Sequence, residues 1–87
     1  MANIASQRKR IARARREHDE NRRLTSAVKT HFRRLEDAAS NGDPEEIEAE
    51  HRRLVSRIDK AARTGALHSN TAARKKARAA RIRARAS

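Results

Sequence analysis

The sequence predicts an all-α protein, a three-helix bundle with a long, basic N-terminal helix that extends beyond the bundle. Two observations carry this prediction. The 87 residues include only two Gly and one Pro, and these fall in two short segments that leave three long stretches uninterrupted. Within these stretches the apolar residues recur every three or four positions, as on one face of an α-helix. We expect helices over residues 6–40, 44–63 and 70–85 of one small domain, residues 1–87.

The first predicted helix has two unlike halves. Ser6 can cap its start, and between Arg8 and Arg23 there are eight cationic residues with Ile11 as the only large apolar one. A helix that is polar all round cannot be held by a core, so this half is expected to be an arm that is protease-sensitive and weakly helical until it is bound. The second half carries an apolar stripe, namely Leu24, Val28, Phe32, Leu35 and Ala39.

A short turn joins the first two helices. Gly42 suits the left-handed residue that ends a helix, Asp43 can cap the next one, and Pro44 can take its first position. Because the turn is short, the two helices should be antiparallel neighbours. The buried face of the second helix is predicted to contain Ile47, His51, Leu54, Val55, Ile58 and Ala62.

Gly65 should end the second helix, and Leu67 should pin the following turn to the core. Asn70, or else Ser69, is the expected cap of the third helix. Four alanines share one face of that helix and could lie close against a neighbouring backbone. They are Ala73, Ala77, Ala80 and Ala84.

Charge is segregated along the chain, which has a net charge of +12 and a pI near 11.7. Residues 1–35 carry a balance of +8, residues 36–59 of −5 and residues 60–87 of +9, with no acidic residue after Asp59. Such a chain favours a phosphate-rich partner. We expect the first and third helices to contact this polyanion, and the acidic start of the second helix to face away from it.

Other classes of function find little support in the sequence. There is no Cys, and the four His residues are far apart in sequence, so no metal site is expected. No nucleophile and base form a recognisable pattern, and so small a chain cannot readily build a closed site; we expect no enzyme, no cofactor and no small-molecule substrate. No apolar run is long enough for a membrane span, and the expected location is the cytoplasm.

Most of the 23 cationic residues are Arg, whose planar fork suits phosphate and base contacts. This favours RNA without excluding DNA. The contacts expected on the first helix are Arg8, Lys9, Arg10, Arg13, Arg15, Arg16, Arg22, Arg23 and Arg33. Those expected on the third helix are Arg74, Lys75, Lys76, Arg78 and Arg81.

Several segments resemble the bacterial small-subunit ribosomal protein S-twenty family. They are Met1-Ala2-Asn3-Ile4 with Ser6 and Lys9-Arg10, then Ser26-x-x-Lys29-Thr30 with Arg33-Arg34, and above all Asp59-Lys60-Ala61-Ala62-x-x-Gly65-x-Leu67-His68-x-Asn70-x-Ala72-Ala73-Arg74-x-Lys76. The resemblance runs the whole length in order. Thr25 and Thr64 depart from it, because a basic residue is usual at both positions.

The resemblance implies a three-helix bundle that binds 16S ribosomal RNA early in assembly of the small subunit. It implies contacts to the 5′ domain and the long penultimate stem, next to other small-subunit components on the ribosome. RNA contacts are implied for Ser6, Lys9, Arg10, Lys29, His68, Asn70, Arg74 and Lys76. His68, which lies in the turn before the third helix, could equally be a cap.

Two rival functions remain open at this point. A nucleoid-type DNA-packaging protein would share the charge and the helices, but it should bind duplex DNA without structural preference. A helical adaptor for an acidic protein should ignore RNA at physiological salt. Competition between folded ribosomal RNA and bulk DNA separates an RNA-binding protein from a DNA-packaging one. Loss of all RNA binding at physiological salt would favour the adaptor.

Overall fold

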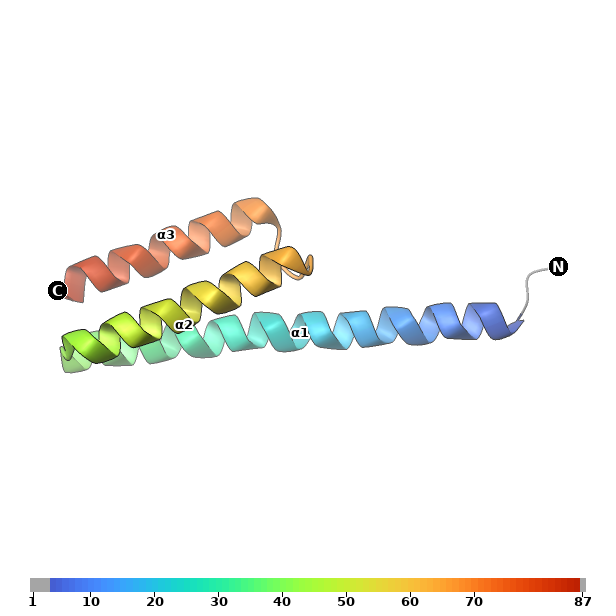
Figure 1. The fold of residues 1–87 in the computed structure, drawn as a ribbon, viewed down its shortest axis with the longest axis horizontal. Coiled ribbons are helices and arrows are strands. Elements are labelled where there is room, and N and C mark those ends of the chain that lie inside the picture. Colours follow the sequence, from blue (N-terminus) through green and yellow to red (C-terminus); the bar gives the residue numbers. More distant parts are fainter. Residues whose placement is uncertain (1–3, 87) are drawn as a thin grey trace.

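The chain folds into three α-helices in a computed structural model that describes residues 4–86 (Figure 1). They are α1 (Ile4–Asn41), α2 (Pro44–Arg63) and α3 (Ser69–Ala86). The all-α prediction with a long first helix is confirmed. Residues 1–3, which open the matched tetrapeptide, and residue 87 lie outside the described part of the chain.

The turn between α1 and α2 follows the predicted chemistry. Gly42 has φ +76°, and its N–H donates to the carbonyl oxygen of Ala38 at 3.0 Å. Asp43 caps α2, because its Oδ1 accepts a hydrogen bond from the N–H of Glu45 at 3.1 Å. Pro44 takes the first helical position, where no N–H is needed. The chain therefore reverses, and α2 runs back along the second half of α1 (Figure 1).

The turn between α2 and α3 has a different cap from the one we expected. Gly65 has φ +82°, and Leu67, which packs against the core, donates its N–H to the carbonyl oxygen of Ala61 at 3.1 Å. His68 then caps α3: its ring Nδ1 accepts from the N–H of Asn70 at 3.1 Å, and its carbonyl accepts from Ala72 at 2.9 Å. The prediction of Asn70 as the cap is wrong, because the imidazole nitrogen of His68 supplies the acceptor two residues earlier.

The core begins at Leu24 and joins all three helices. Its buried apolar residues are Leu24, Val28, Phe32, Leu35, Ala38, Ile47, Leu54, Ile58, Ala61, Ala72 and Ala79. Ala39, His51, Val55 and Ala62, which were expected on the buried faces, are only partly buried. Nothing in the described chain packs against α1 before this core, so residues 4–23 project past the α2–α3 turn (Figure 1). We call residues 4–23 the arm.

The orientation of α3 reverses one prediction. Ala73, Ala77, Ala80 and Ala84 are all exposed, whereas Ala72 and Ala79 are buried. Ile82 is the only large apolar residue of α3 and packs against the core, and Ala72 and Ala79 share its side of the helix. Turning that side inward removes the large aliphatic side chain of Ile82 from water together with the methyl groups of Ala72 and Ala79.

Candidate nucleic-acid interface

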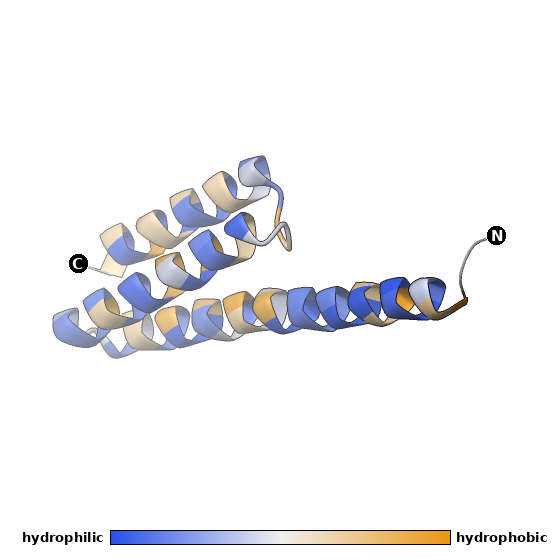
Figure 2. Cartoon of the chain, turned by 45° about the vertical axis from the view of Figure 1, so that its right-hand side comes forward, coloured by the Kyte–Doolittle hydropathy of each residue, from blue (hydrophilic) through white to orange (hydrophobic). Residues whose placement is uncertain are grey.

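The arm is a helix with almost no protein around it. Every residue from Ile4 to Arg23 is exposed, apart from the partly buried Asn21, and Figure 2 shows mostly hydrophilic colours along it. Ile11 is its one large apolar side chain beyond the first turn and is 54% exposed. The arm therefore presents its side chains to the surroundings rather than to the bundle.

Eight of the predicted contacts lie on this arm, together with Ser6. They are Arg8, Lys9, Arg10, Arg13, Arg15, Arg16, Arg22 and Arg23. No ion pair joins any of them to a carboxylate within residues 4–86. At about 100° per residue these positions point to most sides of the helix. The arm is thus a rod of positive charge that can meet phosphates on more than one side.

The cations of α3 are partly neutralised by the other two helices. Lys76 Nζ lies 3.0 Å from Asp59 Oδ1 of α2, and Arg78 Nη2 lies 3.1 Å from Glu36 Oε1 of α1. Arg83 Nη1 lies 3.2 Å from Glu48 Oε1 of α2. The expectation that the acidic start of the second helix faces away from the polyanion-binding side is therefore wrong for Glu48, because packing places its carboxylate beside Arg83 of α3.

These three ion pairs are exposed, with side chains 44–59% accessible. Such pairs contribute about 0–1 kcal/mol in water, so a phosphate can compete for the same cation at little cost. Arg74, Lys75 and Arg81 make no ion pair with a carboxylate within the described helices.

Phe32 orders two of the predicted contacts at the edge between α1 and α3. The Arg78 guanidinium carbon lies 5.0 Å from the ring centroid, and Lys75 Nζ lies 5.9 Å from it. Phe32 as a whole is 7% exposed, so the two cations lie beside a largely buried residue. Cation–π contacts of this kind hold the charges in place while leaving them near solvent.

The remaining predicted contacts are also on the surface. Lys29 and Arg33 are exposed and stand one turn apart on the second half of α1. His68 and Asn70 are exposed at the start of α3, where the cap bond occupies His68 Nδ1. The structure therefore spreads the predicted residues over the arm, the flank of α1 and the start and middle of α3, with no single pocket joining them within the described residues.

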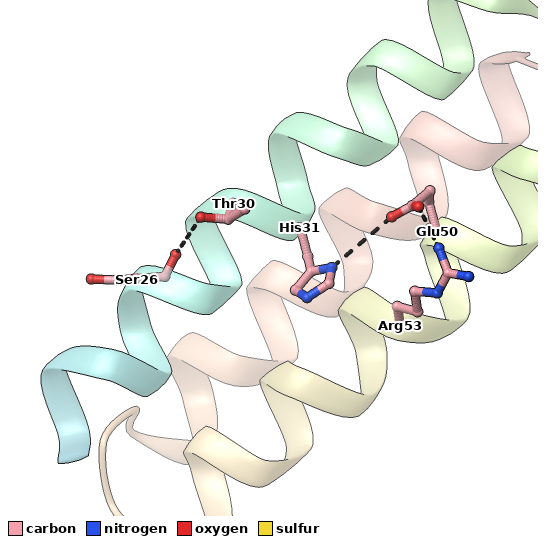
Figure 3. A network of polar contacts seen from close by, with 5 residues as sticks. All are labelled: Ser26, Thr30, His31, Glu50 and Arg53. Carbon is pink, nitrogen blue, oxygen red and sulfur yellow. Dashed lines mark hydrogen bonds and ion pairs between the residues drawn. The ribbon is translucent and has the colours of Figure 1, made fainter.

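Sequence reasoning missed a buried polar group between α1 and α2 (Figure 3). Glu50 is 8% exposed and His31 is 9% exposed. Glu50 Oε1 accepts a hydrogen bond of 2.6 Å from Arg53 Nη1, and its Oε2 lies 4.0 Å from His31 Nδ1. Position 50 lies three residues after Ile47 and four before Leu54, so its place on the apolar face was readable from the sequence.

Two histidines have lowered pKa values in this packing. Burial lowers the pKa of His31 below its usual value, and the charges of Arg34 and Arg57 lower it further. Burial also lowers the pKa of His51, and the charge of Arg83 lowers it further.

Among residues 4–86 no three His, Asp or Glu side chains converge on a point that could hold a metal ion. Within the same residues no helix is long and apolar enough to span a membrane.

Comparison of the sequence with those of known proteins identifies one family. The family model described as "Ribosomal protein S20" matches residues 2–83. The small ribosomal subunit protein bS20 of Koribacter versatilis is 41% identical over 88 residues, covering 100% of this chain and 99% of its own length. That of Pelotomaculum thermopropionicum is 42% identical over 78 residues, covering 90% and 89%. That of Acaryochloris marina is 42% identical over 89 residues, covering 94% and 95%. This chain, with its basic arm and three-helix bundle, belongs to the ribosomal protein S20 family of the small subunit.

Proposed function

We propose that this protein is a structural component of the small ribosomal subunit and binds 16S ribosomal RNA directly. The single observation that carries the proposal is the arm. It holds eight cations that make no ion pair within the described chain and have no core to pack on. A polyanion such as RNA supplies the negative charge that these cations lack within the described chain, and its condensed counterions are released on binding.

The arrangement supports shape recognition rather than base reading. The deep major groove of A-form RNA hides its base edges, and a protein helix that meets it contacts phosphates and riboses. The arm points cations to most of its sides, and α3 adds Arg74, Lys75 and Arg81 on a separate helix. The protein acts as a clamp: its cations neutralise phosphates of neighbouring RNA helices and lower the repulsion between those helices.

The two helices play different parts in this clamp. The arm extends past the α2–α3 turn and can enter a gap between RNA stems. The bundle fixes the direction of the arm, because α1 continues without a break from Ile4 to Asn41. In this proposal the RNA elements brought together are the two that the family resemblance implies, the 5′ domain and the long penultimate stem of the 16S ribosomal RNA.

Salt dependence tests the proposal. The association constant for a transcript of the small-subunit ribosomal RNA is measured over a series of salt concentrations. Each phosphate contact contributes a slope of about 0.7 to 0.9 in the plot of log affinity against log salt, so we expect a slope of several units. An association constant that does not change with salt contradicts direct phosphate binding.

A competition experiment addresses the DNA-packaging alternative. Bulk duplex DNA is added to the complex between the protein and the ribosomal RNA transcript, and the RNA that remains bound is measured. We expect the folded RNA to be retained against an excess of DNA, because the clamp needs separate stems that lie close together. Equal competition by DNA would favour a packaging protein.

A further inference from the structure

A shallow groove runs between α1 and α2. Its lining residues are His31 from α1 and Ala49, Arg52, Arg53, Ser56 and Arg57 from α2. Arg53 and Arg57 lie well over a quarter turn round α2 from Glu48 and Asp59, which are the residues that pair with α3. Figure 3 views this side, with α3 behind the two helices. The groove is therefore on the face of the bundle turned away from α3.

Positive charge converges on this groove from both helices. Arg57 of α2 lines the groove, and Arg34 of α1 stands three residues after the lining residue His31, on the same side of that helix. Both charges lower the pKa of His31, after the larger effect of burial. Neither they nor Arg52 make an ion pair with a carboxylate within residues 4–86. Because the two cations come from different helices, only the folded bundle assembles them.

Glu50 is the acidic group beside the groove, where it pairs with the lining residue Arg53 and lies near His31. Its carboxylate is 11% exposed and holds Arg53 Nη1 at 2.6 Å, while the Arg53 side chain is 59% exposed. The buried carboxylate fixes one end of the guanidinium fork and leaves its other nitrogens accessible. Glu50 is thus a positioning residue for Arg53, and the hydroxyl of Ser56 adds a possible donor in the same groove.

We propose that this groove binds a further RNA phosphate backbone, separate from those on the arm and α3, through Arg34, Arg53 and Arg57. The inference rests on the proposed function and extends it to a face of the bundle that the predicted contacts leave empty. An acidic protein would need apolar anchors for a stable interface, and Ala49 is the only apolar residue that lines the groove. A phosphate backbone needs no such anchor.

The first test compares two variants with the same change of charge on the same helix. Arg57→Gln removes a cation from the groove, and Arg63→Gln removes an exposed cation from the last turn of α2, outside the groove. Salt slopes are measured with the small-subunit ribosomal RNA transcript. We expect Arg57→Gln to lower the slope by about 0.7 to 0.9 and Arg63→Gln to leave it unchanged.

The double variant Arg34→Gln/Arg57→Gln should lower the slope by about 1.4 to 1.8, because two phosphate contacts are lost. Arg34 and Arg57 are both exposed, so the fold should be retained, and far-ultraviolet circular dichroism and urea unfolding verify this. Wild-type slopes for both Arg57→Gln and the double variant would overturn the inference.

A sandwich experiment separates the inference from the function on which it rests. One RNA duplex is immobilised, the protein is added, and capture of a second, labelled duplex is measured. We expect Arg34→Gln/Arg57→Gln to capture clearly less of the second duplex than the wild type does, while the arm and α3 of the variant still bind RNA. If the wild type binds no RNA, the proposed function fails. If wild type and double variant capture the second duplex equally, the groove proposal fails and the proposed function stands.

Discussion

The two halves of α1 have the same secondary structure for different reasons. In residues 24–41 the helix buries Leu24, Val28 and Leu35 against α2 and α3, and tertiary packing stabilises it. In residues 4–23 the one large apolar side chain beyond the first turn, Ile11, is 54% exposed, and the helix has only the local propensity of its Arg, Ala and Glu residues. A continuous helix can therefore be part of the fold at one end and an independent binding element at the other.

The same contrast holds for charge. The bundle pairs Lys76, Arg78 and Arg83 of α3 with carboxylates of α1 and α2, whereas no cation of the arm makes an ion pair within the described chain. Stability should therefore depend on the bundle, and the largest share of RNA affinity should come from the arm. Variants confined to one half should change one property and leave the other.

The largest effect is expected from the arm. Replacing Arg8, Arg10, Arg13 and Arg16 with Gln removes four phosphate contacts, which should lower the affinity for the ribosomal RNA transcript by about 2 to 3 orders of magnitude at physiological salt. The urea midpoint of the bundle should not move, because none of these side chains touches the core. Filter binding and urea unfolding measure the two properties.

The matched control replaces the same four residues with Lys. This variant keeps the charge and loses the planar fork of Arg, so it should retain most of the salt slope. A loss of affinity below tenfold in the Gln variant would show that the arm is not the principal contact.

The next effect concerns stability and uses two isoleucines. Ile58 is fully buried in α2 and Ile11 is 54% exposed in the arm. Ile58→Ala should destabilise the bundle by about 2 to 5 kcal/mol, whereas Ile11→Ala should change the free energy of unfolding by about 0.5 kcal/mol or less. Urea unfolding measures both.

If Ile58→Ala leaves no folded state to measure, Ile58→Val supplies the comparison, with an expected loss of about 0.5 to 1.5 kcal/mol. Equal effects of the buried and the exposed substitution would mean that the arm packs against something in the free protein. That result would remove the distinction between the two halves.

Local signals in the sequence were enough for the helices and for the arm. The first turn could be placed from residue types alone, because each of its three residues favours one position. Gly42 favours the end of a helix, Asp43 the N-cap and Pro44 the first helical position. The arm's exposure follows from the absence of apolar partners between Arg8 and Arg23. These features depend on neighbours in sequence, and sequence analysis could therefore find them.

The features that were missed depend on how the helices pack. The buried side of α3 is decided by Ile82 rather than by its more numerous alanines, and the partners of Arg78 and Arg83 lie 42 and 35 residues away. The groove lined by His31 and Arg57 exists only where α1 meets α2. Charge counts along the chain could not show these pairings, because they specify no register between helices.

A smaller effect tests the cap of α3, a feature that belongs to the bundle alone. His68→Ala removes the ring nitrogen that accepts from Asn70 N–H, and losing such a cap costs about 1 kcal/mol. Asn70→Ala should cost less, because its side chain makes no hydrogen bond within the described chain. The free energy of unfolding is measured for both variants; a larger loss for Asn70→Ala would return the cap to that residue.

The weakest dependence we expect is on pH, and it too should be confined to the bundle. The folded state lowers the pKa of His31 and His51, mainly through burial. As the pH falls below about 6.5, the unfolded chain takes up protons before the folded chain does, so stability declines with falling pH and is level above this range. Urea unfolding across this range should show the decline, and His31→Leu/His51→Leu should flatten it. His18→Gln, in the exposed arm, is the matched control for the loss of an imidazole. Stability that rises as the pH falls would mean that both rings gain, rather than lose, from being charged in the folded bundle.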